Sequence, residues 1–507
     1  MRRKYLFSSI ILTCMLLSFL LPKSICALYV PDFRVNTDSS IGIAQYYADI
    51  AFDPSGNFII VYTDRGVNHD HRKVYFQRFD SLANRVGEPV LVSDSAIPSN
   101  DEPHIAMHPS GKFVIVWGAG KPDPIINFIL NIYLRRYDSF GNPLGLPQKV
   151  DVDRPDTTDC ANFSAEVAMD KDGNFVVVWE SQEPYKGGMA YGQLFNSSGE
   201  RVGNNFYISD PSACDYHISQ QGEFPRVAYN SQGYFFVCWK GVYRGRSDSP
   251  NWSMGRVYTP SGQPLTKVFL LFAPGSQNYG NHVAVASNSQ NNFVTAFSWN
   301  DTLWTYPNNA VAVRTFDTLG HPLDDLVVAN DTVDLGDIWW MTRIAVDGQD
   351  GYVVLWQDDR AGRNLWAQRF GPDNRPIGRN YRVNIPLNSL GTPSGAGWNN
   401  FMYDLDIYKN TVGFAWVDFR NYRTYNADIY AKLLDLDKIG YYHRGDLNLD
   451  GRVDTGDVIY VLNYLFKNGW GILPAWTGDV NADGRTTVTD VIYLVNYLFK
   501  GGPDPQK

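Results

Sequence analysis

Two near-identical segments close to the C-terminus carry oxygen ligands at the spacing of a cation-binding loop. Residues 445–467 read GDLNLDGRVDTGDVIYVLNYLFK, and residues 478–500 read GDVNADGRTTVTDVIYLVNYLFK. Each segment opens with Asp-x-Asn-x-Asp-Gly and has a further Asp at loop position 12. A hard cation that takes about six to eight oxygen ligands suits this pattern, and the smaller, strictly octahedral Mg²⁺ suits it less well. The sequence therefore predicts calcium binding.

The expected ligand positions are the same in both loops. Positions 1, 3 and 5 supply side-chain oxygens, position 7 a backbone carbonyl, position 9 usually a water contact, and position 12 closes the shell from a helix. The ligand positions are Asp446, Asn448, Asp450, Arg452, Asp454 and Asp457 in the first loop, and Asp479, Asn481, Asp483, Arg485, Thr487 and Asp490 in the second. A single string of this kind could be an Asp/Asn-rich turn, but its tandem repetition favours two Ca²⁺ ions.

Each loop runs into a segment with apolar residues at helical spacing. An apolar stripe in the first segment is marked by Val458, Val461, Leu462 and Leu465, and it is widened by Tyr460, Tyr464 and Phe466. Such a stripe predicts an amphipathic helix. We expect the two helices to pack on each other and the remaining aromatic side chains to face a partner.

These paired loop–helix segments, over residues 441–503, resemble a type I dockerin. The module is EF-hand-like, lacks the entering helix of an EF-hand and has Asp at position 12 of both loops. The resemblance implies docking onto a cohesin-like module of a scaffold or surface protein, often in polysaccharide catabolism. It also implies that loop positions 10 and 11, often hydroxyl residues, select the partner. Here these positions hold Thr455, Gly456, Val488 and Thr489, which departs from the familiar specificity. The near-identity of the two helices implies two docking orientations.

A second repeat fills the middle of the chain. Each copy is an apolar strand, a polar turn and a second strand ending in an aromatic residue, as in IAFDPSGNFIIVY and IAMHPSGKFVIVW. The copies lie at 50–62, 105–117, 167–179, 227–239, 283–297, 344–356 and 405–416. Most are followed by two further strands, for example within 74–94 and 365–384. Seven four-stranded units predict an all-β seven-bladed β-propeller over residues 28–440, with a small all-α calcium-binding domain at 441–507.

The two ends of the repeat region indicate how the propeller closes. The seventh repeat stops at 429–437 and lacks a final strand, whereas residues 32–38 (DFRVNTD) resemble the RNYRVN that ends near 384. We therefore expect the N-terminal strand to complete the last blade, which removes an open sheet edge. The alternative is an open array or solenoid.

The N-terminus has the pattern of a secretory signal peptide. Arg2, Arg3 and Lys4 precede a long apolar run, and small residues lead to a cut after Ala27. The alternative is an uncleaved membrane anchor, since the run is near the lower limit for a span. We predict cleavage of residues 1–27, an extracellular, secreted protein and no membrane insertion afterwards. Removal of residues 1–27 takes away Arg2, Arg3, Lys4 and Lys23 and no acid, so the formal net charge becomes more negative than −9; this argues against nucleic acid or an anionic membrane as a partner.

Export permits a disulfide between Cys160 and Cys214, while Cys238, inside YFFVCWK, is expected to be a buried core thiol. These scattered cysteines do not form a zinc site.

The ligand of the propeller stays open at this stage. Glycosidases need two carboxylates, and the loops offer Asp123, Glu180, Glu223 and Asp301, none of which the sequence singles out. Tryptophans could stack on sugar rings or pack inside: Trp252, Trp299, Trp304, Trp339 and Trp340. Strings such as Trp356-x-Asp358-x-Arg360 are expected to be structural ion pairs at hairpin ends.

The sequence favours a displayed propeller for glycan or protein binding. The alternatives are a glycoside hydrolase or polysaccharide lyase, and a mediator of protein contacts in a surface assembly. Catalytic residues remain unassigned.

Overall fold

The fold is taken from a computed structural model of the 507-residue chain. The described residues are 29–37, 44–66, 72–93, 99–123, 127–152, 161–183, 187–210, 221–242, 251–272, 279–300, 309–331, 341–358, 360, 364–384, 403–419, 427–447, 453–467, 472 and 475–505. The predicted signal peptide, Cys160 and Cys214 lie outside them, so those predictions stay untested.

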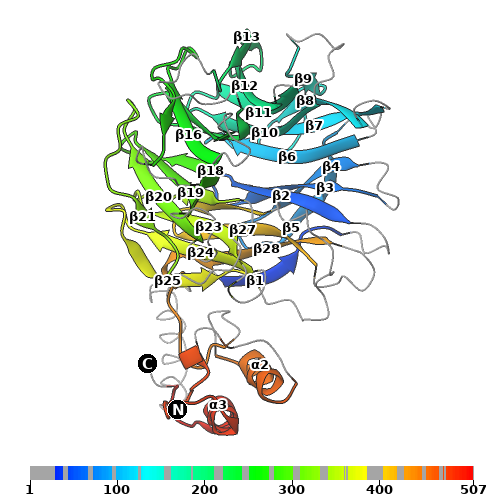
Figure 1. The fold of residues 1–507 in the computed structure, drawn as a ribbon. Coiled ribbons are helices and arrows are strands. Elements are labelled where there is room, and N and C mark those ends of the chain that lie inside the picture. Colours follow the sequence, from blue (N-terminus) through cyan, green and yellow to red (C-terminus); the bar gives the residue numbers. More distant parts are fainter. Residues whose placement is uncertain are drawn as a thin grey trace, which may run out of the picture.

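The strands of the described residues form seven four-stranded antiparallel sheets arranged around a central channel (Figure 1). Blade 1 consists of β2 (Gln45–Phe52), β3 (Phe58–Asp64), β4 (Lys73–Phe79) and β5 (Arg85–Leu91). Blade 2 consists of β6 (Ser99–Met107), β7 (Phe113–Asp123), β8 (Asn127–Tyr137) and β9 (Gln148–Lys149). Blade 3 consists of β10 (Ala161–Met169), β11 (Phe175–Glu183), β12 (Gly187–Phe195) and β13 (Arg201–Tyr207). Blades 4 and 5 consist of β14 (Glu223–Tyr229), β15 (Phe235–Val242), β16 (Asn251–Tyr258) and β17 (Phe269–Leu270); β18 (Tyr279–Ser287), β19 (Phe293–Asn300), β20 (Asn309–Phe316) and β21 (Val327–Val328).

Blades 6 and 7 complete the circle. They consist of β22 (Arg343–Val346), β23 (Tyr352–Asp358), β24 (Asn364–Phe370) and β25 (Pro376–Arg382); β26 (Tyr403–Tyr408), β27 (Thr411–Asp418), β28 (Asp428–Asp435) and β1 (Tyr29–Arg34). The predicted seven-bladed propeller is confirmed.

The N-terminal strand closes the propeller as the sequence predicts. Strand β1 pairs antiparallel with β28, so the outermost strand of blade 7 comes from the opposite end of the propeller sequence. The side chain of Asn36 secures this junction, donating from Nδ2 to Oδ1 of Asp428 (2.9 Å) and accepting from the backbone N–H of Ile429 (2.9 Å). Strand β1 therefore covers the outer edge of β28, which would otherwise be unpaired.

The polar turn of each repeat has a physical reason for its Asp and Gly. In blade 1 the carboxylate of Asp53 accepts from the backbone N–H of Ser55 (2.7 Å) and Asn57 (3.0 Å). Gly56 follows at φ 85°, in the left-handed region that favours glycine. The same Asx-type turn recurs at Asp170, where the backbone N–H groups of Asp172 and Asn174 donate to the carboxylate.

The core lies within and between the blades, and aromatic pairs recur in it. The residue that opens the second strand stacks on the residue that closes the third: Phe58 on Phe79, Phe113 on Tyr137, Phe175 on Phe195, Phe235 on Tyr258, and Tyr352 on Phe370. The aromatic residue that ends the repeat motif is fully buried in five blades, as Trp117, Trp179, Trp239, Phe297 and Trp356. Cys238 is also fully buried, which confirms the expected core thiol. The high aromatic content therefore serves blade packing.

The innermost strands β2, β6, β10, β14, β18, β22 and β26 surround the channel. The end of the channel where they begin is here called the N-face, and the end where they finish is called the C-face. Strand β28 finishes at the C-face, where the chain leaves the propeller.

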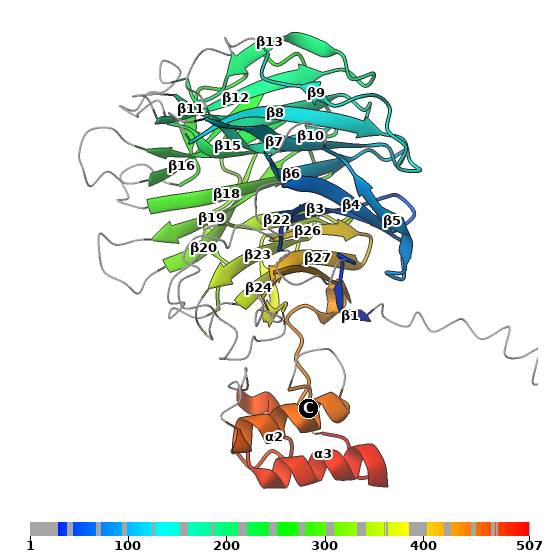
Figure 2. The ribbon, with the colours of Figure 1, turned by 90° about the vertical axis from the view of Figure 1, so that its right-hand side faces the viewer.

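The connection to the C-terminal domain packs against blade 6. It includes the 3₁₀ helix η3 (Leu436–Lys438). The guanidinium of Arg369 pairs with Asp437 (2.7 Å), the backbone N–H of Arg379 donates to the carbonyl of Gly440 (3.1 Å), and Ile439 is fully buried. Helices α2 (Thr455–Phe466) and α3 (Val488–Lys500) then lie outside the propeller, on the side of blades 6 and 7 (Figures 1 and 2). Helix η4 (Ala475–Thr477) lies between them in sequence.

The two helices enclose a small core of their own. Leu447, Val461, Val480 and Leu494 are fully buried there. Val461 and Val458 face this core as predicted, whereas Leu462 and Phe466 are exposed. Among the helices of the described residues, none has the length and apolar character needed to cross a membrane.

Candidate functional sites

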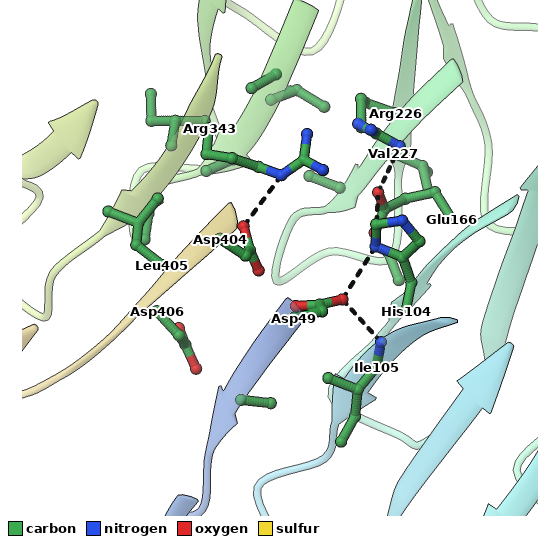
Figure 3. A pocket seen from close by; sticks show the side chains of 18 of the residues that line it. Asp49, His104, Ile105, Glu166, Arg226, Val227, Arg343, Asp404, Leu405 and Asp406 are labelled. Atoms are coloured by element: carbon green, nitrogen blue, oxygen red, sulfur yellow. Dashed lines mark hydrogen bonds and ion pairs between the residues drawn. The ribbon is translucent and has the colours of Figure 1, made fainter. Parts of the chain in front are cut away.

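Six charged or titratable side chains line the central channel, each from a different innermost strand (Figure 3). Each stands immediately before the apolar residue that opens the repeat motif of its blade. This set, here called the channel ring, consists of Asp49, His104, Glu166, Arg226, Arg343 and Asp404. In β18 the same sequence position holds His282. The apolar repeat therefore carries a charged or titratable residue at one fixed position, with a different side chain in neighbouring blades.

A bulge in the innermost strand positions four of these side chains. In β2 the pairing with β3 shifts register between Tyr46 and Asp49, and β6, β10 and β14 shift at the equivalent place. Two residues before the ring residue the backbone takes a positive φ, at Tyr47 (55°), Glu102 (53°), Ser164 (50°) and Phe224 (52°). Since a bulge changes the direction of the following side chain, the distortion aims the ring residues at the channel.

His104 is the centre of a short network of contacts between blades 1 to 4. Its Nδ1 lies 3.0 Å from Oδ2 of Asp49 and 3.6 Å from Oε2 of Glu166. The same oxygen of Glu166 accepts from Nη1 of Arg226 (2.9 Å), and Oδ2 of Asp49 also accepts from the backbone N–H of Ile105 (2.9 Å). All four ring side chains are at most 17% exposed, so their mutual contacts are little screened by water.

On the other side of the ring, Nε of Arg343 pairs with Oδ1 of Asp404 (3.2 Å). Burial raises the pKa of Asp49 to about 6 and that of the nearby Asp406 to about 7. Burial and the neighbouring Asp49 carboxyl hold the pKa of Asp404 well above its usual range. Burial lowers the pKa of His104 to about 4, so the imidazole is neutral near pH 7. The ring therefore has more carboxyl groups than cations to pair with them.

The channel ring borders a cavity of about 380 Å³. The cavity continues along the innermost strands to Phe52, Met107 and Tyr229, which end β2, β6 and β14 at the C-face. A volume of this size admits several water molecules or a small polar group beside the ring.

Two acids that the sequence offered as catalytic candidates meet at the N-face. Glu180, on β11, is 1% exposed and accepts from the backbone N–H of Phe224 (3.1 Å). Glu223, at the start of β14, pairs with Nζ of Lys240 (2.8 Å). A Cβ placed on Gly188 would lie within 3.0 Å of both glutamate side chains, so the two lie side by side. Burial, and then the Glu223 carboxylate, raise the pKa of Glu180 to about 8.

The remaining residues of the propeller that the sequence offered as candidates either have a packing role or have side chains that are not described. Trp252 is partly buried against two core clusters, one between blades 3 and 4 and one between blades 4 and 5. Asp358 accepts from Nε1 of Trp356 (2.8 Å) and pairs with Arg360 (2.6 Å), which is the structural ion pair expected there. Only the backbone of Asp123 and Trp299 is described, and Asp301, Trp304, Trp339 and Trp340 lie outside the described residues.

In the C-terminal domain the second loop is described in full. The carboxylate of Asp479 accepts from the backbone N–H groups of Asp483 (2.8 Å) and Gly484 (3.0 Å), and Oδ1 of Asn481 also accepts from Asp483 (2.9 Å). Asp490 is fully buried and accepts from the N–H groups of Asn481 (3.1 Å) and Thr487. Gly484 takes φ 88° at the sharp turn. The loop thus winds around its own carboxylates and amide oxygen.

The first loop is described at its two ends. Asp446, Asp454 and Asp457 are described, whereas Asn448, Asp450 and Arg452 lie outside the described residues. Asp457 is fully buried and accepts from the backbone N–H groups of Leu447 (2.7 Å) and Asp454 (2.9 Å). Asp457 in α2 and Asp490 in α3 both close a capping box at the helix start, which confirms that the two loop–helix units are built alike.

Residues 444–499 match the family model described as the dockerin type I domain. The C-terminal domain is a type I dockerin. The match covers this domain alone, and the propeller precedes it in the chain.

Solved structures resemble the propeller at low sequence identity. A protein of unknown function from Dyadobacter fermentans DSM 18053 is 10% identical, with a TM-score of 0.47 over 80% of this chain and 98% of that chain. The polysaccharide lyase Uly1 is 10% identical, with a TM-score of 0.49 over 81% and 94% of the two chains. An α-L-arabinofuranosidase from Fusarium graminearum is 8% identical, with a TM-score of 0.43 over 82% and 99%. No curated protein sequence matches this chain significantly.

The dockerin exposes matched apolar side chains on its two helices. Ile459 of α2 and Ile492 of α3 hold the same place in the repeat and are 60% and 55% exposed. Phe466 and Phe499 form a second matched pair, each 65% exposed. Of the four predicted partner-selecting residues, Thr455, Val488 and Thr489 are exposed and Gly456 is half-buried. The dockerin therefore offers two similar apolar surfaces, one on each helix.

The residues of the second dockerin loop fit a calcium ion. Its side-chain donors are the carboxylates of Asp479, Asp483 and Asp490 and the amide of Asn481, all oxygen donors of the kind a hard cation prefers. The buried Asp490 would otherwise keep a charge away from water, which is costly without a cation.

Sequence reasoning missed the channel ring. The repeat alignment starts at the apolar residue and so left out the position just before it, which reads Asp, His, Glu, Arg, His, Arg, Asp through the seven blades. A charged or titratable residue at one position of every apolar repeat is the signal that could have found it.

Proposed function

We propose that this protein is secreted, docks through its calcium-loaded dockerin onto a cohesin module of a scaffold or surface protein, and uses its propeller to bind a glycan or protein ligand. The observation that carries the proposal is the dockerin domain at residues 444–499, since a dockerin implies a cohesin partner. The exposed pairs Ile459/Ile492 and Phe466/Phe499 support it, because exposed apolar side chains on a small domain are typical of a protein-binding surface.

Two Ca²⁺ ions are part of this proposal. One ion would be bound by Asp446, Asn448, Asp450, Arg452, Asp454 and Asp457 of the first loop. The other ion would be bound by Asp479, Asn481, Asp483, Arg485, Thr487 and Asp490 of the second loop. The ions would neutralise the carboxylates at the start of each helix and so hold α2 and α3 in the arrangement that a cohesin recognises.

Calorimetric titration of the full chain with a panel of cohesin modules tests the docking role. We expect at least one cohesin to bind in millimolar calcium and the binding to be lost in EGTA. Absence of binding to every cohesin, with the dockerin shown to be calcium-loaded and folded, would overturn the docking role.

A carbohydrate-active enzyme is a second candidate, favoured by the Glu180–Glu223 pair. A protonated acid beside an ionised carboxylate is the arrangement that acid–base cleavage of a glycosidic bond uses. The raised pKa of Glu180 and the ion pair of Glu223 with Lys240 fit these two states. The pair occurs in one blade junction, as a catalytic set would.

A glycan array together with a turnover screen on the full chain separates the two candidates. Binding without turnover supports a binding propeller. Turnover that falls at least about a hundredfold in Glu180→Gln, with the exposed Glu200→Gln as a control, supports the enzyme.

A further inference from the structure

We propose that Asp49, His104 and Glu166 bind a divalent transition-metal ion of the Zn²⁺ class in the propeller channel. One ligand atom from each residue, Oδ2 or Oδ1 of the aspartate, Nδ1 of the imidazole and an oxygen of the glutamate, lies within 4.8 Å of the other two. The site is separate from the calcium loops of the dockerin, because its ligands belong to blades 1, 2 and 3 of the propeller.

The distances suit a tetrahedral metal ion. Ligand atoms bound at about 2.1 Å around such an ion lie about 3.4 Å from one another. Nδ1 of His104 lies 3.0 Å from the aspartate oxygen and 3.6 Å from the glutamate oxygen, which brackets this value. Small rotations of the side chains are therefore enough to place an ion between the three groups (Figure 3).

The three ligands are held by the fold. They occupy the same position in three adjacent innermost strands, each directly after a β-bulge. The backbone N–H of Ile105 fixes Asp49, and the guanidinium of Arg226 fixes Glu166. Metal ligands are characteristically oriented by such outer hydrogen bonds.

The charge around the ligands favours a cation. Four carboxyl groups line the cavity, those of Asp49, Glu166, Asp404 and Asp406, and two guanidinium groups, those of Arg226 and Arg343, accompany them.

The ligand types select the metal class. An imidazole with two carboxylates suits Zn²⁺ and similar ions, whereas Ca²⁺ prefers oxygen ligands alone. Three protein ligands leave one coordination position open, as in catalytic rather than structural zinc sites. The cavity of about 380 Å³ beside the ring gives this position access to water or to an anionic group of a ligand.

The test is zinc binding to the full chain in saturating calcium, so that the dockerin loops are filled. Isothermal titration with ZnCl₂ is expected to find a site in the wild type that is at least about tenfold weaker in His104→Gln and Glu166→Gln. His108→Gln is the matched control, because His108 is a half-buried histidine in the turn after β6, where its ring bonds Ser110 and the carbonyl of Lys171, and should leave this site unchanged. Equal zinc affinity in wild type and both ring variants would overturn the proposal.

A second measurement covers the case in which a ring variant does not fold. Crystals of the wild-type chain are soaked in ZnCl₂ and measured at the zinc absorption edge. An anomalous peak between Asp49, His104 and Glu166 supports the site. Zinc peaks elsewhere with none in the channel would overturn it and leave the ring as a network of ion pairs between blades.

Discussion

Nδ1 of His104 lies 3.0 Å from Oδ2 of Asp49, although the two residues belong to different blades. The contact joins β6 to β2 at the channel, and Glu166 extends it to β10 and, through Arg226, to β14. Four of the seven blades are thus connected by little-exposed polar and charged side chains that line the channel.

Glu166→Ala is expected to destabilise the propeller strongly. The substitution leaves the guanidinium of Arg226, which is 5% exposed, without its carboxylate partner. Breaking a buried pair from one side costs about 3–5 kcal/mol. Urea denaturation followed by tryptophan fluorescence measures the change, with the exposed Glu88→Ala as control. A loss no larger than that of the control would mean that Arg226 finds another partner.

The double variant Asp446→Ala/Asp479→Ala is expected to abolish calcium-dependent folding of the dockerin. Both aspartates stand at loop position 1 and are at most 9% exposed. Without them the remaining donors do not complete a calcium shell. Differential scanning calorimetry with and without EGTA detects the change. Asp504→Ala, beyond α3, is the control and should keep the calcium effect; an unchanged calcium effect in the double variant would contradict the ligand assignment.

Cohesin binding is expected to need only one of the two matched helix surfaces. Ile459→Asp and Ile492→Asp should each weaken a cohesin complex by less than about tenfold, whereas the double variant should lose more than about a hundredfold. The reason is that either helix can present the same exposed isoleucine. Leu146→Asp, at an exposed leucine of the propeller, is the control. If one single variant abolishes binding, docking uses one orientation.

Stability is expected to fall as the pH rises toward 8 because of Glu180. Its pKa is about 8 in the folded chain and near 4.5 when unfolded, so the folded state holds the extra proton between these values. The free energy of unfolding therefore decreases across this window and levels off above it, by an upper limit on the order of 5 kcal/mol. Glu180→Gln should remove this part of the slope.

Urea unfolding at pH 5, 7 and 9 checks this, with Glu88→Gln as control. The difference between Glu180→Gln and the wild type isolates Glu180 from Asp406, whose raised pKa acts in the same direction. A difference that stays constant with pH would show that Glu180 is ionised throughout.

Asn36→Ala is expected to weaken closure of the propeller by about 2 kcal/mol, since buried partners on Asp428 and Ile429 lose their hydrogen bonds. The exposed Thr37→Ala is the control, and thermal unfolding measures both. Equal melting temperatures would mean that β1 pairing alone seals blade 7.

The architecture could be predicted from the sequence because its signals are local and repeated. The Asp53-type turns, the aromatic residues that end the second strands and the tandem loops with Asp457 and Asp490 each act within one repeat. Closure by β1 was also predictable, since a missing strand at one end matched a surplus strand at the other.

The propeller site could not be predicted in the same way. Asp49 and Asp404 meet between the adjacent blades 1 and 7, and Glu180 meets Glu223 across a blade junction, from positions far apart in the chain. Which of the many acidic side chains come into contact depends on the arrangement of the blades and on the β-bulges. Neither of these can be read from a single repeat.

The packed connection after β28 affects the orientation in which a scaffold would carry the propeller. Arg369 forms an ion pair with Asp437, and Ile439 is buried, so the connection between the propeller and its dockerin is packed against blade 6 at these residues and is not a flexible linker there. A docked propeller would therefore keep one orientation relative to the scaffold instead of rotating freely about its connection. Two docking orientations would then give two discrete poses of the channel, half a turn apart, on neighbouring copies along one scaffold.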